Sequence, residues 1–124
     1  MRPNLLLIED DVDIAQSLSE IMQQYFIIEH TTHGSEAIKK LKTKKYHIIV
    51  SDQLLPGQIT GDEILRQARQ SQPETVLFLM TGIHIDEYTA RLLRKQKVRL
   101  IRKPIQDYEK MIAQLRLFVT PKAS

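Results

Sequence analysis

The amino-acid sequence predicts an α/β fold, in which five parallel strands form one sheet and helices pack on both of its faces. Three observations predict this fold. Short apolar runs recur along the chain, stretches with apolar residues three and four positions apart lie between them, and capping or turn residues separate the two kinds of segment. Strands that alternate with helices indicate parallel pairing, because each strand must cross over through a helix to lie beside its neighbour.

The first strand is expected at residues 5–8, where three leucines and an isoleucine follow one another. A run that is apolar throughout is typical of a strand buried on both faces of a sheet. The first helix follows, with apolar residues at helical spacing from Ile14 to Tyr25 and with Asp11 or Asp13 as its cap. A weaker apolar run at Ile27-Ile28 predicts a second strand at an edge of the sheet.

The middle of the chain repeats this pattern. Gly34-Ser35 opens the second helix, whose apolar residues run from Ala37 to Leu41. The third strand is expected at residues 48–50, again apolar throughout. Gly61-Asp62 opens the third helix, and its apolar residues run from Ile64 to Ala68.

The last third of the chain supplies two more strands and two more helices. Pro73 separates the third helix from a fourth strand at residues 76–80. Apolar residues at helical spacing then run from Tyr88 to Leu93, a fifth strand is expected at residues 98–101, and a fifth helix spans the spacing from Ile105 to Val119.

Length and composition limit the class of protein. With 124 residues, 42% of them hydrophobic, the chain fits one domain over 1–124, with flexible ends expected at 1–4 and 120–124. The longest apolar runs are far too short to span a bilayer and the N-terminus lacks a signal-peptide pattern, so a cytoplasmic protein without membrane contact is expected. The absence of cysteine excludes disulfides, thiolate metal sites and cysteine nucleophiles.

The net charge of +3 raises the question of nucleic-acid binding. The basic residues fall mainly at 39–45 and 91–102, where apolar positions interleave with them. This pattern favours solvated helix faces over a nucleic-acid surface, and the sequence lacks a recognition motif or an aromatic stacking platform. No direct nucleic-acid binding is expected.

Chemically versatile residues follow four of the predicted strands. Ligands of parallel sheets bind at the carboxyl ends of the strands, so the residues in these places are candidates for a shared site. They are Glu9-Asp10-Asp11, Ser51-Asp52, Thr81-Gly82 and Arg102-Lys103-Pro104. Taken singly, each group also fits a helix cap, a turn or a solvated lysine, but independent turns need not converge at one sheet edge.

Several carboxylates at one edge would repel one another unless a cation joins them. Oxygen ligands without histidine or cysteine favour Mg²⁺, which keeps several waters and binds beside phosphate oxygens. The hydroxyl of Thr81 and the ammonium of Lys103 suit the remaining oxygens of a phosphoryl group.

These motifs together resemble the response-regulator receiver family. Glu9 and Asp10 match its acidic pair, Asp52 its phospho-acceptor, and Thr81 its switch hydroxyl, while Lys103-Pro104 matches the lysine followed by a proline, a bond that is typically cis in this family. The similarity covers essentially the whole chain, with four motifs in order and in register. It implies a flavodoxin-like strand order, 2-1-3-4-5.

The resemblance also implies a function. Asp52 would receive a phosphoryl group from a histidine kinase, a phosphotransfer protein or a small phosphodonor, with Lys103 offsetting charge. Glu9, Asp10, Asp52 and the backbone carbonyl of Leu54 would hold Mg²⁺. Thr81 would then turn toward the phosphoryl oxygens. The chain would be a signalling phospho-acceptor rather than an enzyme, with only incidental self-phosphorylation and self-dephosphorylation.

Three departures from the family concern the loop and the switch. The loop after Asp52 reads Leu-Pro-Gly-Gln-Ile-Thr-Gly, one residue longer than usual and without its aspartate. Gly82 stands where alanine is common. Leu100 occupies the position of the switch aromatic, and a leucine fills less volume and lacks a polar tip.

The output surface is expected on the fourth helix, fifth strand and fifth helix, with a basic rim that favours an acidic partner surface or a cis-acting output domain. A downstream protein and a phosphorylation-dependent dimer are further expected partners. The alternative function is a receiver-fold interaction module that works without phosphorylation, and Leu100 with the altered loop keeps it open. The rim residues are Arg91, Arg94, Lys95, Lys97 and Arg99.

Overall fold

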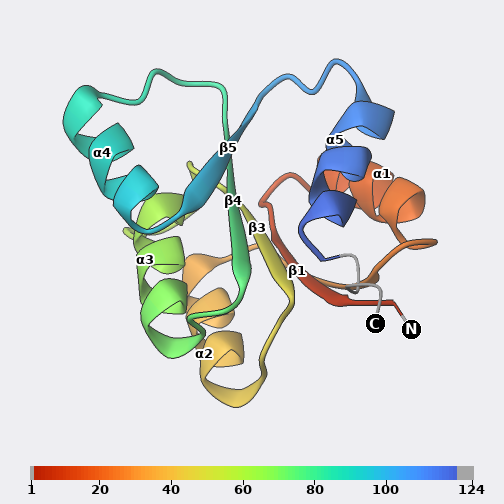
Figure 1. The fold of residues 1–124 in the computed structure, drawn as a ribbon, viewed down its shortest axis with the longest axis horizontal. Helices are drawn as coiled ribbons and strands as arrows, with labels where there is room; N and C mark the ends of the chain where they lie inside the picture. The colour runs from red at the N-terminus through yellow and green to blue at the C-terminus, as the bar shows by residue number, and fades with distance from the viewer. Residues whose placement is uncertain (1, 120–124) are drawn as a thin grey trace.

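The computed structural model describes residues 2–119, and these form a five-stranded parallel sheet between two layers of helices (Figure 1). The strand order is β2-β1-β3-β4-β5, which confirms the predicted fold and the predicted edge position of the second strand. Neighbouring strands all pair in parallel. The strands are β1 (Asn4–Ile8), β2 (Ile27–Thr31), β3 (Ile48–Asp52), β4 (Val76–Thr81) and β5 (Val98–Arg102).

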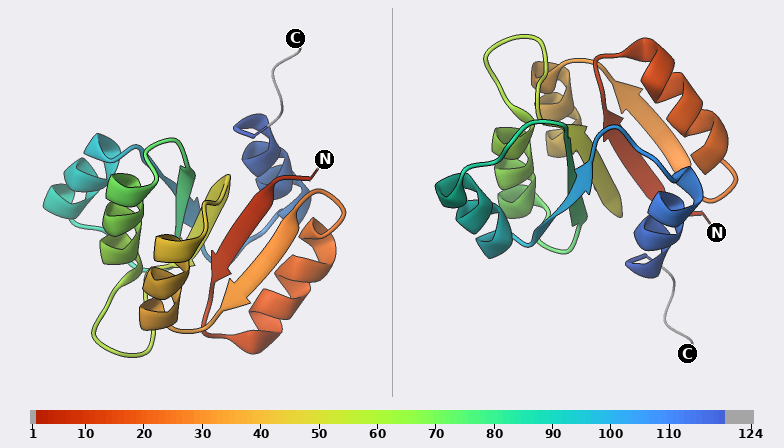
Figure 2. Two further views of the ribbon diagram at one scale, coloured as in Figure 1. Left: turned by 90° about the horizontal axis from the view of Figure 1, so that it is seen from below. Right: turned by 90° about the horizontal axis from the view of Figure 1, so that it is seen from above.

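Helices cover both faces of the sheet. Helices α1 and α5 lie on one face, and α2, α3 and α4 lie on the other (Figures 1 and 2). Within residues 2–119, no helix combines the length and the apolar character that a membrane crossing needs. The helices are α1 (Val12–Met22), α2 (Gly34–Thr43), α3 (Gly61–Ser71), α4 (Glu87–Lys95) and α5 (Tyr108–Leu117).

The central strands divide the hydrophobic core into two halves. Leu5 and Leu7 of β1 face the layer of α1 and α5, whereas Leu6 and Ile8 face the layer of α2, α3 and α4. All four side chains are fully buried. The continuous apolar runs in the sequence have this cause, because a strand covered on both faces buries its odd and its even residues alike.

Two helices are shorter than their apolar spacing predicted. Helix α1 ends at Met22, before Tyr25, and α5 begins at Tyr108, after Ile105. Both outlying residues still pack against the core beside α1 and α5, so their spacing reflects packing rather than helix. Asp107 sets the start of α5, because its carboxylate accepts a hydrogen bond from the backbone N–H of Lys110.

Most of the other predicted boundaries lie within two residues of those in the structure. Asp11, not Asp13, caps α1, and its side chain accepts from the N–H of Ile14 at 3.1 Å. Helices α2 and α3 begin at the predicted glycines, Gly34 and Gly61. Of the ends expected to be flexible, residues 1 and 120–124 lie outside the described residues, and Asn4 is the first residue of β1.

A buried polar network holds the amino-terminal edge of the sheet. The Gln72 side chain accepts from the N–H of Tyr46 at 2.9 Å and donates to the carbonyl oxygens of Leu41 and Lys44. The Thr75 hydroxyl donates to the Tyr46 carbonyl at 2.7 Å. Gln72 is 3% exposed, and its hydrogen bonds join the loops that precede β3 and β4.

Candidate functional site

The sequence-predicted site residues meet at the carboxyl edge of the sheet, opposite the Gln72 network. Glu9 and Asp10 follow β1, Asp52 ends β3, Thr81 ends β4, and Lys103 follows β5. Parallel pairing brings these strand ends together although the residues lie far apart along the chain. The peptide bond between Lys103 and Pro104 is cis, as the resemblance implied.

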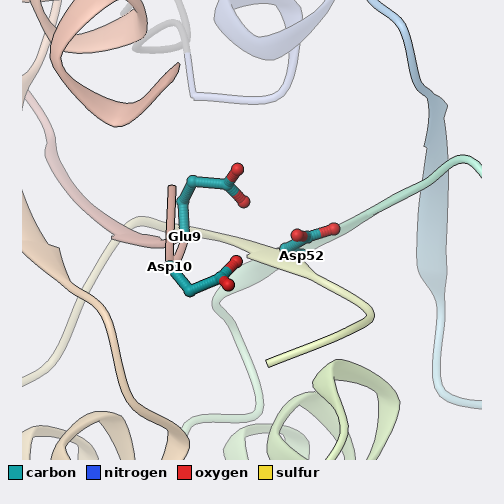
Figure 3. A group of neighbouring side chains, drawn as sticks. All are labelled: Glu9, Asp10 and Asp52. Atoms are coloured by element: carbon teal, nitrogen blue, oxygen red, sulfur yellow. The ribbon is translucent and has the colours of Figure 1, made fainter. Parts of the chain in front are cut away.

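Three carboxyl groups converge at the ends of β1 and β3. One oxygen each of Glu9, Asp10 and Asp52 lies within 4.8 Å of the others (Figure 3). Glu9 is fully buried and Asp52 is 8% exposed, whereas Asp10 is open to solvent. The cluster therefore has a buried base and an exposed rim through which a ligand can enter.

Lys103 bridges the two buried carboxyl groups. Its Nζ lies 3.3 Å from Glu9 Oε1 and 3.3 Å from Asp52 Oδ2. Burial alone would lower the pKa of Lys103, but the charges of Glu9 and Asp52, with hydrogen bonds to both, raise it above its usual value. The other oxygen of Asp52, Oδ1, accepts from the N–H of Gln53 at 3.0 Å.

Glu9 carries the strongest electrostatic signal of the site. Burial, together with a hydrogen bond to Asp52 and repulsion from it, raises the pKa of Glu9 to about 7, although Lys103 acts in the opposite direction. Within the described residues 2–119, Glu9 Oε2 is buried and has no hydrogen-bond partner. Lys103 contacts two of the three carboxyl groups of the cluster, so these groups outnumber the ammonium beside them. A hard cation with oxygen ligands, such as Mg²⁺, fits this orphaned acceptor and the excess of negative charge.

Thr81 is buried at the end of β4, and its hydroxyl bonds to the following loop. Thr81 Oγ1 accepts from the N–H of Ile83 at 3.1 Å and lies 3.3 Å from the Ile83 carbonyl oxygen, to which it can donate. A turn of this hydroxyl toward Asp52 therefore requires that both contacts to Ile83 break.

The other predicted residues lie at the surface. The side chain of Leu54, two residues after Asp52, is 58% exposed, and that of Leu100 is 43% exposed. Leu100 pairs in register with Leu79 of β4, on the face of the sheet that α4 covers. All five residues of the predicted basic rim on α4 and β5 are exposed.

The loop after Asp52 is shaped by two glycines. Gly57 has a φ of +95°, a conformation that glycine adopts without steric penalty. A β-carbon on Gly61 would overlap the carbonyl oxygen of Asp52, so only glycine lets α3 approach the acceptor strand this closely. Gly82 is different, since a β-carbon there would meet the Lys103 carbonyl at 3.4 Å, an ordinary contact that alanine can make.

Sequence reasoning missed two residues that brace the site. Gln53, which is 9% exposed, exchanges two hydrogen bonds of 2.9 Å with Asp62 at the start of α3. His30 of β2 places Nε2 2.7 Å from the carbonyl oxygen of Glu9. Gln53 carried one signal in the sequence, its place directly after a buried strand, and His30 carried none beyond its place near an edge strand.

Comparisons with known proteins agree with this arrangement. A family model described as the response regulator receiver domain matches residues 5–116. The regulatory protein VanRB of Enterococcus faecalis is 29% identical over 107 residues, covering 86% of this chain and 48% of the relative. The homolog of the transcriptional regulatory protein CpxR from Haemophilus influenzae is 29% identical over 122 residues, covering 97% of this chain and 52% of the relative. The chain thus spans about half the length of these two relatives.

Solved structures share the fold. The crystal structure of a CheY-like response regulator receiver domain protein from Methanospirillum hungatei matches with a TM-score of 0.85, covering 94% of this chain and 93% of that one. At 18% sequence identity, this likeness shows a common arrangement of strands and helices.

Proposed function

The chain belongs to the family of response regulator receiver domains, and from this membership we propose that Asp52 accepts a phosphoryl group from a histidine kinase or a phosphotransfer protein. Receiver domains are the phospho-accepting modules of two-component signalling and are not enzymes in the usual sense. The observation that carries the proposal for this chain is the placement of Lys103 and two further carboxyl groups around the Asp52 carboxylate.

The proposed step is an in-line displacement at phosphorus. An oxygen of Asp52 forms the new bond to phosphorus while the bond from phosphorus to the donor's imidazole nitrogen breaks, and the product is an acyl phosphate. Asp52 needs no general base, because it reacts as the carboxylate. The Lys103 ammonium, already 3.3 Å from Asp52 Oδ2, offsets negative charge on the transferring group.

Glu9, Asp10, Asp52 and the backbone carbonyl of Leu54 would hold Mg²⁺ at this edge. When bound, the ion supplies positive charge to the transferring phosphoryl group and to the crowded carboxylates. The orphaned Oε2 of Glu9 and the exposed carboxylate of Asp10 support this assignment.

The proposed switch starts at Thr81. Its hydroxyl exchanges the Ile83 backbone for a phosphoryl oxygen, and the loop after β4 moves with it. The side chain of Leu100 lies on the face of the sheet that α4 covers. It would fill part of the space that the Thr81 side chain leaves when it turns. The signal then reaches the basic rim of α4 and β5, where a downstream protein, a cis-acting output domain or a second copy would bind. We place this activity in the cytoplasm.

The test uses a small phosphodonor with Mg²⁺, followed by intact mass measurement. Wild type is expected to gain one phosphate-sized mass, and Asp52→Ala is expected to gain none. Asp13→Ala, which removes an exposed aspartate of α1 outside the site, is the matched control and should behave as wild type. Phosphate on Asp52→Ala, or none on wild type, would reject Asp52 as the acceptor and favour an interaction module that works without phosphorylation.

A further inference from the structure

The side chain of Gln53 joins the acceptor strand to the start of α3. Gln53 Nε2 donates to Asp62 Oδ1, and the N–H of Asp62 donates back to Gln53 Oε1, both at 2.9 Å. The Thr60 hydroxyl donates to the same Asp62 oxygen. Gln53 and Asp62 thus form a reciprocal pair that spans the whole loop between β3 and α3.

The backbone of Gln53 is held as firmly as its side chain. Its N–H lies 3.0 Å from the carbonyl oxygen of Met80 and 3.0 Å from Asp52 Oδ1, and its carbonyl accepts from the N–H of Gly61 at 2.9 Å. Gly61 in turn lies against the carbonyl of Asp52. Gln53 is therefore fixed through its N–H, its carbonyl and its amide side chain.

This arrangement leaves a short free loop with two fixed ends. The loop begins at Leu54, directly after Gln53, and it ends at Thr60, the residue before α3. Because Gln53 is fixed, the position of the Leu54 carbonyl depends on the torsion angles of one residue rather than on the whole loop. The extra residue of this loop can then be accommodated without displacement of Leu54.

We propose that Gln53 is a positioning residue for the phospho-acceptor site, which acts by holding the Leu54 carbonyl in place as a Mg²⁺ ligand. This inference rests on the proposed function. Gln53 touches Asp52 through its backbone N–H, but its side chain contacts α3 and leaves the reacting atoms free. Its contribution is thus to metal affinity rather than to the phosphoryl-transfer step.

The test compares two buried glutamines. Gln53→Met removes the amide but keeps the length of the side chain, and Gln72→Met makes the same change in the network at the opposite edge of the sheet. Binding is measured calorimetrically with MgCl₂ alone. Gln53→Met is expected to weaken Mg²⁺ binding about tenfold, the lower end of the effect of losing a group that supports a metal ligand. Gln72→Met is expected to lower stability and leave Mg²⁺ affinity unchanged.

A second readout separates positioning from general loss of structure. The Mg²⁺ concentration at half-maximal phosphorylation should rise with the same factor in Gln53→Met, while the rate at saturating Mg²⁺ returns to that of wild type. Asp62→Ala removes the acceptor of the amide from the more accessible side of the pair. It should weaken Mg²⁺ binding less than Gln53→Met, because the N–H of residue 62 still donates to Gln53.

Two results would overturn the inference. One is equal Mg²⁺ affinity in wild type, Gln53→Met and Asp62→Ala, and the other is an equal loss of affinity in Gln72→Met. Both leave the proposed function intact so long as wild type binds Mg²⁺ and takes up phosphate. If wild type itself does neither, the proposed function fails.

Discussion

Glu9 shows how far a single residue of this site departs from its behaviour in water. Its carboxyl group is fully buried beside Asp52, and one of its oxygens has no partner among residues 2–119. Such a group destabilises the fold when it is charged and unpaired. The exposed Asp10 beside it adds repulsion that a bound cation would relieve, so single carboxylates of this cluster are expected to affect stability and metal binding in opposite directions.

Replacement of Asp10 by asparagine tests this opposition. Because one hard ligand oxygen loses its charge, Asp10→Asn should weaken Mg²⁺ binding at least about tenfold and slow phosphorylation at limiting Mg²⁺. Without metal, the same variant should melt at a higher temperature than wild type, since repulsion is reduced. Calorimetric Mg²⁺ titration and thermal unfolding in chelator measure the two effects.

The neighbouring residue supplies the control for Asp10→Asn. Asp11→Asn removes a charge next to the site but keeps the helix cap, because asparagine caps as well as aspartate. It should retain nearly all of the Mg²⁺ affinity. Unchanged Mg²⁺ binding in Asp10→Asn would show that Asp10 is not a ligand. A lower melting temperature of that variant without metal would show that Asp10 is not a source of repulsion.

Leu54 and Ile83 are expected to affect how long the proposed phosphorylated state lasts. Each lies two residues after a site residue, and both side chains are exposed, at 58% and 42%. An apolar side chain cannot orient a hydrolytic water, whereas a polar one can do so by a hydrogen bond. Leu54→Asn and Ile83→Glu should therefore each speed loss of phosphate by roughly tenfold, measured as phosphate release after the donor is removed.

An exposed leucine at the far end of α5 provides the comparison for these variants. Leu117→Asn changes a side chain that is 76% exposed and distant from the site, so phosphate release should match that of wild type. If Leu54→Asn and Ile83→Glu also match wild type, the lifetime is set elsewhere.

At the scale of elements, the edge strand β2 is tied to α2 by charge. Glu29 Oε2 of β2 lies 3.6 Å from Lys40 Nζ of α2 and accepts a hydrogen bond from the hydroxyl of Tyr46 at 2.7 Å. Its other carboxylate oxygen pairs with Lys44, just after α2. The hydrogen bond from Lys44, followed by that from Tyr46 and the charges of both lysines, lowers the pKa of Glu29 although partial burial opposes this. The cluster thus links the edge strand β2 to α2 and to the segment before β3.

The sign of the pH dependence follows from this lowered pKa. A carboxyl group whose pKa is lowered by folding stabilises the fold at pH values above its unfolded pKa of 4.5. This contribution is lost as the pH falls through the pKa of the folded state. Glu29→Gln should therefore reduce the free energy of unfolding at neutral pH by roughly 0.5–1 kcal/mol. The difference from wild type should vanish in acid, as followed by chemical denaturation at both pH values.

Glu74→Gln is the control at neutral pH, where Glu29→Gln is expected to reduce the free energy of unfolding most. Glu74 is exposed in the loop before β4, and its loss should change the free energy of unfolding little. A difference between Glu29→Gln and wild type that persists unchanged in acid would assign the effect to packing instead of charge.

At the scale of the whole molecule, the site depends on the complete sheet. Lys103 bonds to Glu9 across 94 positions of the chain and to Asp52 across 51. The unfolded chain cannot hold the carboxylates of Glu9 and Asp52 together, so an ion that binds both of them binds the folded state alone. Mg²⁺ at ten times its dissociation constant should raise stability by about 1.4 kcal/mol and the melting temperature by about 5 °C.

Thermal unfolding with and without Mg²⁺ measures this linkage. The increase should shrink in Asp52→Ala and remain in Asp13→Ala, because only the first variant alters the carboxyl cluster. An equal increase in both variants would mean that Mg²⁺ stabilises the protein from another place.

The strands and the site could be predicted from sequence for a common reason. Burial on both faces makes the central strands apolar throughout, and parallel pairing then fixes where the residues after them meet. The Gln53–Asp62 pair could not be predicted, because its partners are joined by a loop whose path the sequence does not determine. The end of α4 could not be predicted either. Glycine is the usual residue with a positive φ after a helix, but here Lys97 adopts a φ of +57°.

The candidate site and the Gln72 network lie at opposite edges of the sheet. The candidate site residues gather at the carboxyl edge, and the Gln72 network joins the segments that precede β3 and β4 at the amino edge. Substitutions at the amino edge are therefore expected to alter heat resistance and leave the proposed phosphoryl transfer intact. For protein engineering, this separation offers one end of the molecule for adjusting robustness and the other for adjusting signalling, with little interference between the two.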